Sequence, residues 1–168
     1  GGVDSWVKLN QRSGKLPLGD LLQPAIRSAE EGFPITERVA TDWGRNEAKL
    51  KADANTARMW LKHGRPPKFG EVFRQPEHAK VFREIAPKGR DGFYTGWVAE
   101  DMVDYLNSLG GLHSLEGFAT QEAFWVEPIV ARYKGVDVYE IPPNGVGITT
   151  LLMLNILSGF DLTKYDPV

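Results

Sequence analysis

The sequence of 168 residues contains no cysteine. Disulfide bonds, thiolate nucleophiles and cysteine-based metal sites are therefore excluded. The absence of cysteine does not distinguish a secreted or periplasmic protein from a cytoplasmic one.

Three further features are missing. The longest apolar run, residues 146–157, is interrupted by glycine, threonine and asparagine and is shorter than the about 20 residues of a bilayer span, so we expect no membrane association. The net charge is −2, so the chain has no excess of basic residues of the kind typical of nucleic-acid-binding proteins, and we expect no nucleic-acid partner. No signal-peptide pattern is visible, and the chain opens with Gly1-Gly2 rather than methionine, so we expect an internal segment of a longer protein.

The composition is that of a folded globular protein. Hydrophobic residues make up 42% and charged residues 25% of the chain, which argues against disorder. The length allows one domain, or a small domain with part of another.

Apolar spacing and capping residues predict a mainly α protein. We expect Asp4 or Ser5 to cap the first helix, Pro24 to divide the second, and Asp53 or Asn55 to start the fourth. Val98, Met102, Leu106 and Leu109 are expected to face a core. The expected helices cover residues 4–13, 18–31, 36–51, 53–61, 77–86, 97–109, 114–120 and 146–157.

Near the end of the chain, two short extended runs flank Lys134-Gly135 and predict a β-hairpin. A Pro-Pro-Asn-Gly loop then leads into the last helix, which is apolar almost all round and should be buried on more than one side. Strands do not alternate with helices, so a parallel sheet of βαβ units is not expected.

No residue pattern indicates a catalytic or metal site. His63, His78 and His113 lack partners at metal-ligand spacing and are expected at the surface. The acidic pairs, such as Glu100-Asp101, are expected on solvated helix faces. We therefore assign no catalytic, substrate-binding or metal-binding residue and expect no cofactor.

Two readings of Gly145-Val146-Gly147 stay open. Free N–H groups at a helix start could bind an anion, or the glycines could simply allow a tight strand-to-helix turn. We favour the turn, because the motif lacks the third glycine of a dinucleotide fingerprint and the Lys-Ser/Thr of a P-loop.

Six sequence segments, in order, carry a family resemblance. The first is Gly-Val-Asp-Ser-Trp at 2–6. The second joins Gly-Lys-Leu-Pro-Leu at 14–18 with the run from Gln23 to Phe33, which has Pro-Ala-Ile and Glu-Gly-Phe elements. The others are Gly-Arg-Asp-Gly-Phe-Tyr-Thr-Gly at 89–96, Gly110-Gly111 with Leu115, Tyr-Lys-Gly to Pro at 133–143, and Asn-Ile-Leu to Asp-Leu at 155–162.

Together these segments resemble the large subunit of the gamma-glutamyltransferases, also called gamma-glutamyltranspeptidases, of the N-terminal nucleophile hydrolase superfamily. Residues 41–75 carry little of the resemblance, and residues 144–147 depart from the family's serine- and glycine-rich loop. Arg83 lies in a Phe-Arg-Glu-Ile-Ala-Pro run that looks like the family's arginine motif, but its position before Gly89 matches an ordinary helix, so we expect a surface residue.

The resemblance implies a fold and an organisation. Residues 1–124 would form a helical, orthogonal-bundle-like insert of the large subunit. Residues 125–168 would supply a hairpin and helix to an αββα sandwich core.

The resemblance also implies an enzymatic parent, a zymogen that cleaves itself. The parent would hydrolyse a gamma-glutamyl amide such as glutathione, or transfer its acyl group, through a threonine that lies outside this segment. Its partners would be the rest of the large subunit and the small catalytic subunit, and the isolated segment should be inactive and could self-associate. The alternatives are a related acylase acting on another amide, such as a cephalosporin side chain, or a non-catalytic helical interaction module.

Overall fold

The computed structural model describes residues 1–165. Its internal contacts divide the chain into two compact units, Gly1–Ala123 and Phe124–Val168. The first unit consists of helices and one small sheet, and the second of a β-hairpin with one α-helix. The expected mainly α fold class is thereby confirmed, whereas the assignment of the second unit to a sandwich core stays a prediction.

Nine α-helices and one two-stranded sheet form the first unit. The antiparallel strands β1 (Phe33–Pro34) and β2 (Val72–Phe73) pair Phe33 with Phe73. The helices are α1 (Gly2–Ser13), α2 (Leu18–Glu31), α3 (Glu37–Arg45), α4 (Glu47–Lys51), α5 (Ala54–Trp60), α6 (Pro76–Lys88), α7 (Asp91–Tyr94), α8 (Gly96–Ser108) and α9 (Leu115–Ala119).

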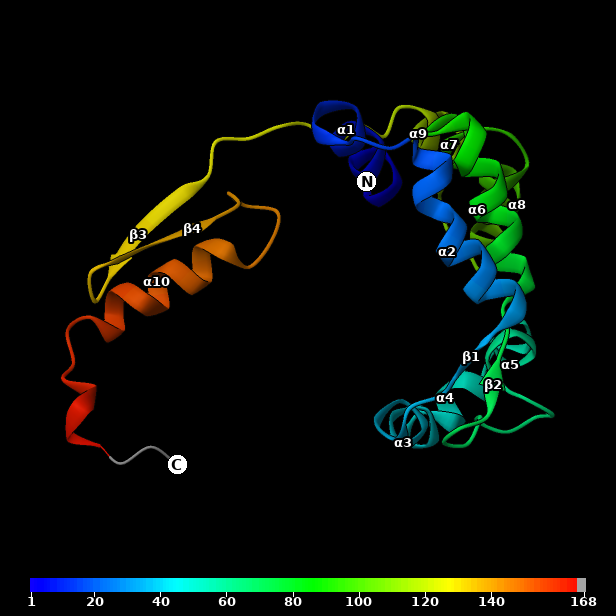
Figure 1. Cartoon of the computed structure of the whole chain (residues 1–168), viewed down its shortest axis with the longest axis horizontal. Coiled ribbons are helices and arrows are strands. Elements are labelled where there is room, and N and C mark those ends of the chain that lie inside the picture. The colour runs from blue at the N-terminus through cyan, green and yellow to red at the C-terminus, as the bar shows by residue number, and fades with distance from the viewer. Residues whose placement is uncertain (166–168) are drawn as a thin grey trace. The chain divides into compact units, whose positions relative to one another are not determined.

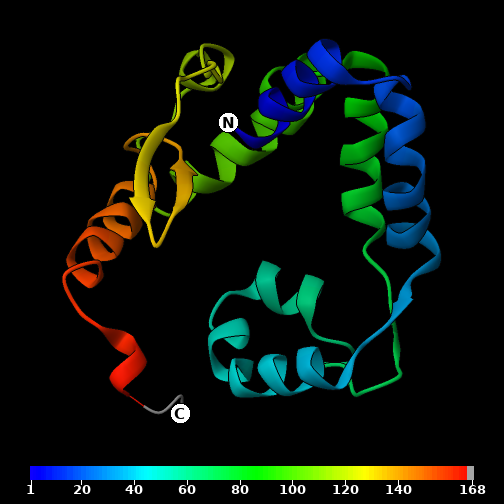
Figure 2. The ribbon, with the colours of Figure 1, turned by 60° about the vertical axis from the view of Figure 1, so that its left-hand side comes forward.

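Helices α2 and α6 lie side by side and form the most extensive contact between helices in this unit (Figures 1 and 2). Ile26 and Ala29 of α2 pack against Ala79 of α6, and Leu22 and Phe82 border the same cluster. Small side chains at the contact let the two backbones approach closely, which favours dense packing. Figure 2 shows β1 and β2 as the two connections that leave α2 and return to α6.

A second core cluster joins α1, α6 and α7. Val3, Ile85 and Tyr94 are buried together there. Gly92 makes the contact possible, because a Cβ at this position would lie 2.3 Å from the Glu84 carbonyl oxygen. Any larger residue would therefore push α7 off the α6 backbone.

The region from α3 to α5 has an aromatic centre of its own. The ring centroids of Trp43 and Phe73 are 4.8 Å apart, and Trp60 lies 5.7 Å from Trp43. The loop before β2 is held by Arg65, which donates to both carboxylate oxygens of Glu71 at 3.0 and 2.7 Å. This hydrogen bonding, with that from the Lys68 backbone N–H, lowers the pKa of Glu71 to about 2.

Several helix limits differ from those that the sequence predicts. Pro24 lies inside a continuous α2 and does not divide it. The helix expected from residue 36 to 51 is broken at Asn46, whose φ and ψ of −101° and 8° leave the helical range. The β1–β2 pair was not predicted, because two residues per strand are too few to show alternation.

Two expectations about side chains are also wrong. Asp4 lies inside α1 and is buried, so it is not a helix cap. On α8 the buried residues are Val98, Ala99 and Val103, whereas Leu109 is 66% exposed beyond the end of the helix. The buried stripe is thus rotated from the predicted one.

The second unit confirms the predicted hairpin. Strands β3 (Ile129–Tyr133) and β4 (Val136–Glu140) are antiparallel and pair Tyr133 with Val136 around a two-residue turn. Lys134 and Gly135 have φ values of 46° and 84°, as two-residue hairpin turns of type I′ require.

Helix α10 (Gly147–Leu157) contacts β3 more than β4 and is followed by a short 3-10 helix, η1 (Leu162–Lys164). Within residues 1–165, no helix is both long enough and apolar enough to cross a bilayer.

Replacing Ile85, which is 1% exposed, tests the core of the first unit. We expect Ile85→Ala to lower the free energy of unfolding by about 2–5 kcal/mol, because it removes buried methyl groups and leaves a cavity. Urea denaturation of the whole chain measures the change. The matched control is Leu109→Ala at an exposed site, for which a change within about 0.5 kcal/mol is expected; equal effects of the two substitutions would contradict the assigned core.

Candidate functional site

The three histidines do not come together. His63 and His113 are exposed, and among residues 1–165 no group of three or more His, Asp or Glu side chains could hold a metal ion. His78 departs from the expected surface position. It is half-buried, with its ring edge-on to Trp60 at 6.1 Å between centroids.

Gly145 and Gly147 lie where a tight turn leads from β4 into α10. A Cβ on Gly147 would lie 2.7 Å from the Ile141 carbonyl oxygen and 3.1 Å from Oε2 of Glu140. The close approach explains the glycine, and the Glu140 carboxylate near the start of α10 complements the positive end of the helix dipole. The geometry therefore favours the structural reading over an anion site.

Arg83 lies on α6 and is occupied by a neighbour on α2. Its Nε and Nη2 donate to Oε1 of Glu30 at 2.9 and 2.7 Å, and Nη2 also reaches Oε2 at 2.8 Å. The pair is exposed and links the two long helices across their outer side.

Asp4 is the one charged side chain in the described part of the chain that is buried, with 1% exposure. Its Oδ2 accepts a hydrogen bond from the Ala123 N–H at 2.6 Å. Arg90 Nε lies 3.6 Å from Oδ1 and Lys8 Nζ 3.6 Å from Oδ2. A buried carboxylate needs such partners, because an unpaired charge away from water is strongly unfavourable.

The two cations also hold the segment from residue 119 to 123. Arg90 Nη2 donates to the carbonyl oxygens of Ala119 and Gln121, the latter at 2.7 Å. Lys8 Nζ donates to Glu122 Oε1 at 2.7 Å and to the Ala123 carbonyl oxygen. The hydrogen bond to Glu122, and then the charge of Asp4, raise the pKa of Lys8. We call Asp4, Lys8 and Arg90 the Asp4 clamp; it ties the start of the first unit to its end.

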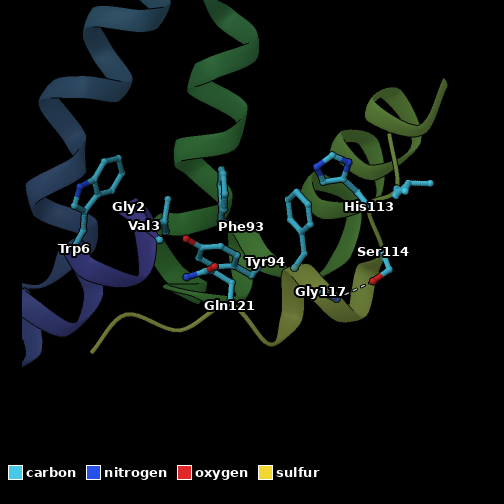
Figure 3. A pocket seen from close by; sticks show the side chains of 12 residues that line it. Gly2, Val3, Trp6, Phe93, Tyr94, His113, Ser114, Gly117 and Gln121 are labelled. Atoms are coloured by element: carbon cyan, nitrogen blue, oxygen red, sulfur yellow. Dashed lines mark hydrogen bonds between the residues drawn. The ribbon is translucent and has the colours of Figure 1, made fainter. Parts of the chain in front are cut away.

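An open groove of about 690 Å³ lies beside the clamp. Figure 3 shows Trp6 of α1 on one side and His113 on the other, with Phe93 and Tyr94 between them. Trp6, Phe93, Tyr94 and Phe118 make much of the lining apolar, and Gln121 adds an amide. Such walls suit an apolar group, with few polar atoms to fix its orientation.

Ser114 and His113 both line this groove but do not form a nucleophile–base pair. The Ser114 hydroxyl caps α9 by accepting from the Gly117 N–H at 3.0 Å, as Figure 3 shows. The His113 backbone is held by Asn107, whose Oδ1 accepts its N–H at 2.9 Å. The arrangement is that of a helix start, and it supplies no activated hydroxyl.

A second, smaller cleft separates α5 from α8. Tyr105 donates its hydroxyl to Asp53 Oδ2 at 2.6 Å, and Asp53 Oδ1 accepts from the Thr56 N–H at 2.7 Å. Those two hydrogen bonds lower the pKa of Asp53, and the bond to Asp53 together with burial raises the pKa of Tyr105. The predicted capping role of Asp53 is confirmed.

The residues of the clamp and of this cleft were not predicted as a site. The spacing of Asp4 and Lys8 on one helix face is visible in the sequence. Their partnership with Arg90 and Ala123 is not, because it depends on long-range folding. Asp53 was expected only as a cap, and nothing in its surroundings in sequence points to Tyr105.

Comparisons with known proteins agree on one family. A family model described as gamma-glutamyltranspeptidase matches residues 1–168. A glutathione hydrolase-like proenzyme (YwrD) of Bacillus subtilis is 36% identical over 166 residues, which cover 99% of this chain and 32% of that protein. The chain thus spans about a third of the length of this relative.

Two solved structures extend the likeness to the fold. A gamma-glutamyltranspeptidase from Helicobacter pylori has a TM-score of 0.89 and 28% identity, covering 98% of this chain and 48% of that one. A cephalosporin acylase from Bacillus halodurans has a TM-score of 0.86 and 38% identity, covering 95% of this chain and 31% of that one.

Replacing Asp4 tests the clamp. We expect Asp4→Asn to lower the free energy of unfolding by about 1.5–3 kcal/mol, because it weakens a buried hydrogen bond to a charged acceptor and removes the counter-charge of two half-buried cations. Urea denaturation gives the change, and amide exchange at Ala123 reports the weakened hydrogen bond. Glu122→Gln, at a side chain that is 73% exposed, is the matched control and should cost less than about 1 kcal/mol. An Asp4→Asn protein as stable as the control would rule the clamp out as a major source of stability.

Proposed function

The chain belongs to the gamma-glutamyltranspeptidase family, and from this premise we propose that it is a large-subunit segment of a self-processing enzyme that cleaves gamma-glutamyl amides. The observation that carries the proposal is the extent of the match, which runs along all 168 residues of this chain but only about a third of a full-length relative. A match of this extent supports a segment of a longer member of the family.

We propose that the reaction of the parent is hydrolysis of a gamma-glutamyl amide such as glutathione, or transfer of its acyl group to an amine. A threonine exposed by autocleavage, in the small catalytic subunit, would attack the amide carbonyl with its own amine as base. The named relatives, a glutathione hydrolase-like proenzyme and a gamma-glutamyltranspeptidase, support this substrate class. A small-subunit partner follows from the same proposal.

The role of this segment would be structural. Helices of the first unit would pack against the catalytic layers and line the substrate cleft. The hairpin and α10 of the second unit would join an αββα sandwich. Apolar side chains on α10 support this assignment, because Ile148, Leu152 and Ile156 recur every four residues and are all exposed; a stripe of this kind is typical of a buried helix face.

A related acylase is the second candidate. The likeness to a cephalosporin acylase, at 38% identity, favours it specifically. The two candidates can be separated by the α-amino group of the gamma-glutamyl substrate. Glutaryl, the same five-carbon acyl chain without that amine, serves as the comparison.

The complete protein that contains this segment tests the proposal. We expect it to appear as two chains after self-cleavage, with a new N-terminal threonine found by mass spectrometry. We also expect it to hydrolyse gamma-glutamyl p-nitroanilide, while the 168-residue chain alone stays at background. Glutaryl p-nitroanilide is the matched substrate.

The outcomes separate the candidates. Faster turnover of the glutaryl anilide would favour the acylase. An uncleaved protein inactive on both substrates would overturn the enzymatic proposal in favour of a non-catalytic helical module.

The second unit should behave differently in the isolated chain and in the complete protein. Two strands and a helix with exposed apolar residues are marginal alone, so we expect fast amide exchange over residues 136–157, or self-association of the isolated chain. Residues 97–108 should exchange slowly in both proteins and serve as the internal reference. A strictly monomeric isolated chain whose amides at 136–157 are as protected as those at 97–108 would show that this unit needs no further cover.

A further inference from the structure

We propose that the cleft between α5 and α8 binds an organic cation with an apolar body, such as an alkylamine or the side chain of lysine or arginine. This site goes beyond the proposed function and does not depend on it. The cleft has a volume of about 360 Å³, within the size range in which small-molecule sites begin. One wall comes from residues 53–60, in the part of the chain with little resemblance to the family, so the site would be a feature of this protein.

The carboxylate of Asp53 lies in the wall of the cleft. Asp53 is held in place by the N–H of Thr56 and the hydroxyl of Tyr105, each donating to a different oxygen. A carboxylate has about four lone-pair positions, so both oxygens keep acceptor capacity for a further N–H donor. Asp53 is half-buried, which strengthens its interaction with a cation relative to a fully solvated acid.

The charged side chains that line the cleft, Asp53 among them, carry a net negative charge. Asp101 on α8 adds a second carboxylate, and Arg58 on α5 adds one guanidinium. Two acids against one base give a formal charge of −1. An anionic ligand would be repelled, and an amine or guanidinium would be attracted.

The rest of the wall suits a hydrocarbon body. Met59, Trp60 and Met102 line the same cleft. Trp60 is fixed by stacking on Phe73, with ring centroids 6.2 Å apart and planes at 17°. A fixed indole can attract a cation through its ring face, and methionine side chains adapt to chains of different shape.

The three methionines of the sequence make the site observable. Met59 and Met102 line the cleft, while Met153 lies on α10 of the second unit. With ¹³C-labelled methionine methyl groups in the 168-residue chain, hexylamine at neutral pH should shift the Met59 and Met102 signals saturably. The Met153 signal should stay in place.

Charge and location are separated by matched controls. Hexanol has the same apolar body without the charge and should bind more weakly. Asp101→Asn should weaken hexylamine binding about two- to fivefold, as loss of an exposed ion pair does. Asp104→Asn, an exposed acid on the same helix that does not line the cleft, should leave the affinity unchanged. Asp53→Asn should also weaken binding, but it alters the N-cap of α5 as well. Asp101→Asn leaves that cap intact and is therefore the decisive variant.

The source of the cation is resolved by a second titration. A short lysine-containing peptide that binds more tightly than hexylamine would indicate a protein partner, and the reverse a small amine. Equal affinities for hexanol and hexylamine would overturn the proposal, as would equal effects of Asp101→Asn and Asp104→Asn. Absence of any shift at Met59 and Met102 would overturn it as well.

Discussion

The buried carboxylate of Asp4 is the constraint on which the first unit depends. A charge with 1% exposure is tolerable only when it is fully paired, and its partners come from three places: Lys8 on its own helix, Arg90 before α7, and the backbone of Ala123. Because Arg90 and Lys8 also hold residues 119–123, the same few interactions fix α1, the start of α7 and the end of the unit. The apolar cluster of Val3, Ile85 and Tyr94 lies next to these interactions, because Val3 precedes Asp4 on α1 and Tyr94 belongs to α7.

Much of the local structure was predictable because it depends on neighbouring residues. The Lys134-Gly135 turn specifies the hairpin through its positive φ values, and Ser114 specifies the start of α9 through its cap. The break at Asn46 and the short β1–β2 pair were not predictable. The β1–β2 pair joins residues about 40 positions apart, and Phe73 of β2 packs on Trp43, a contact that forms only when the chain folds.

The cleft and the clamp show a similar division. Single residues could be assigned local roles, as with Asp53 at the start of α5. Their partners Tyr105 and Arg90 are far away in the sequence, and charge alone does not select them from the other acids and bases. Such long-range pairs could not be predicted from the sequence. The burial of Asp4 could not be predicted either, because it follows from tertiary contacts and not from the position of Asp4 near the start of a helix.

The segments that carry the family resemblance coincide with backbone constraints of this chain. Gly92 lies where a Cβ would meet the Glu84 carbonyl oxygen, and Gly135 closes the hairpin with a positive φ. Gly32 ends α2 with a φ of 89°, where a side chain would meet β2. These residues determine how helices and strands join, so they describe a framework. Residues of this kind determine how a chain folds and not which substrate it accepts, in line with the similarity of this chain to both a gamma-glutamyltranspeptidase and a cephalosporin acylase.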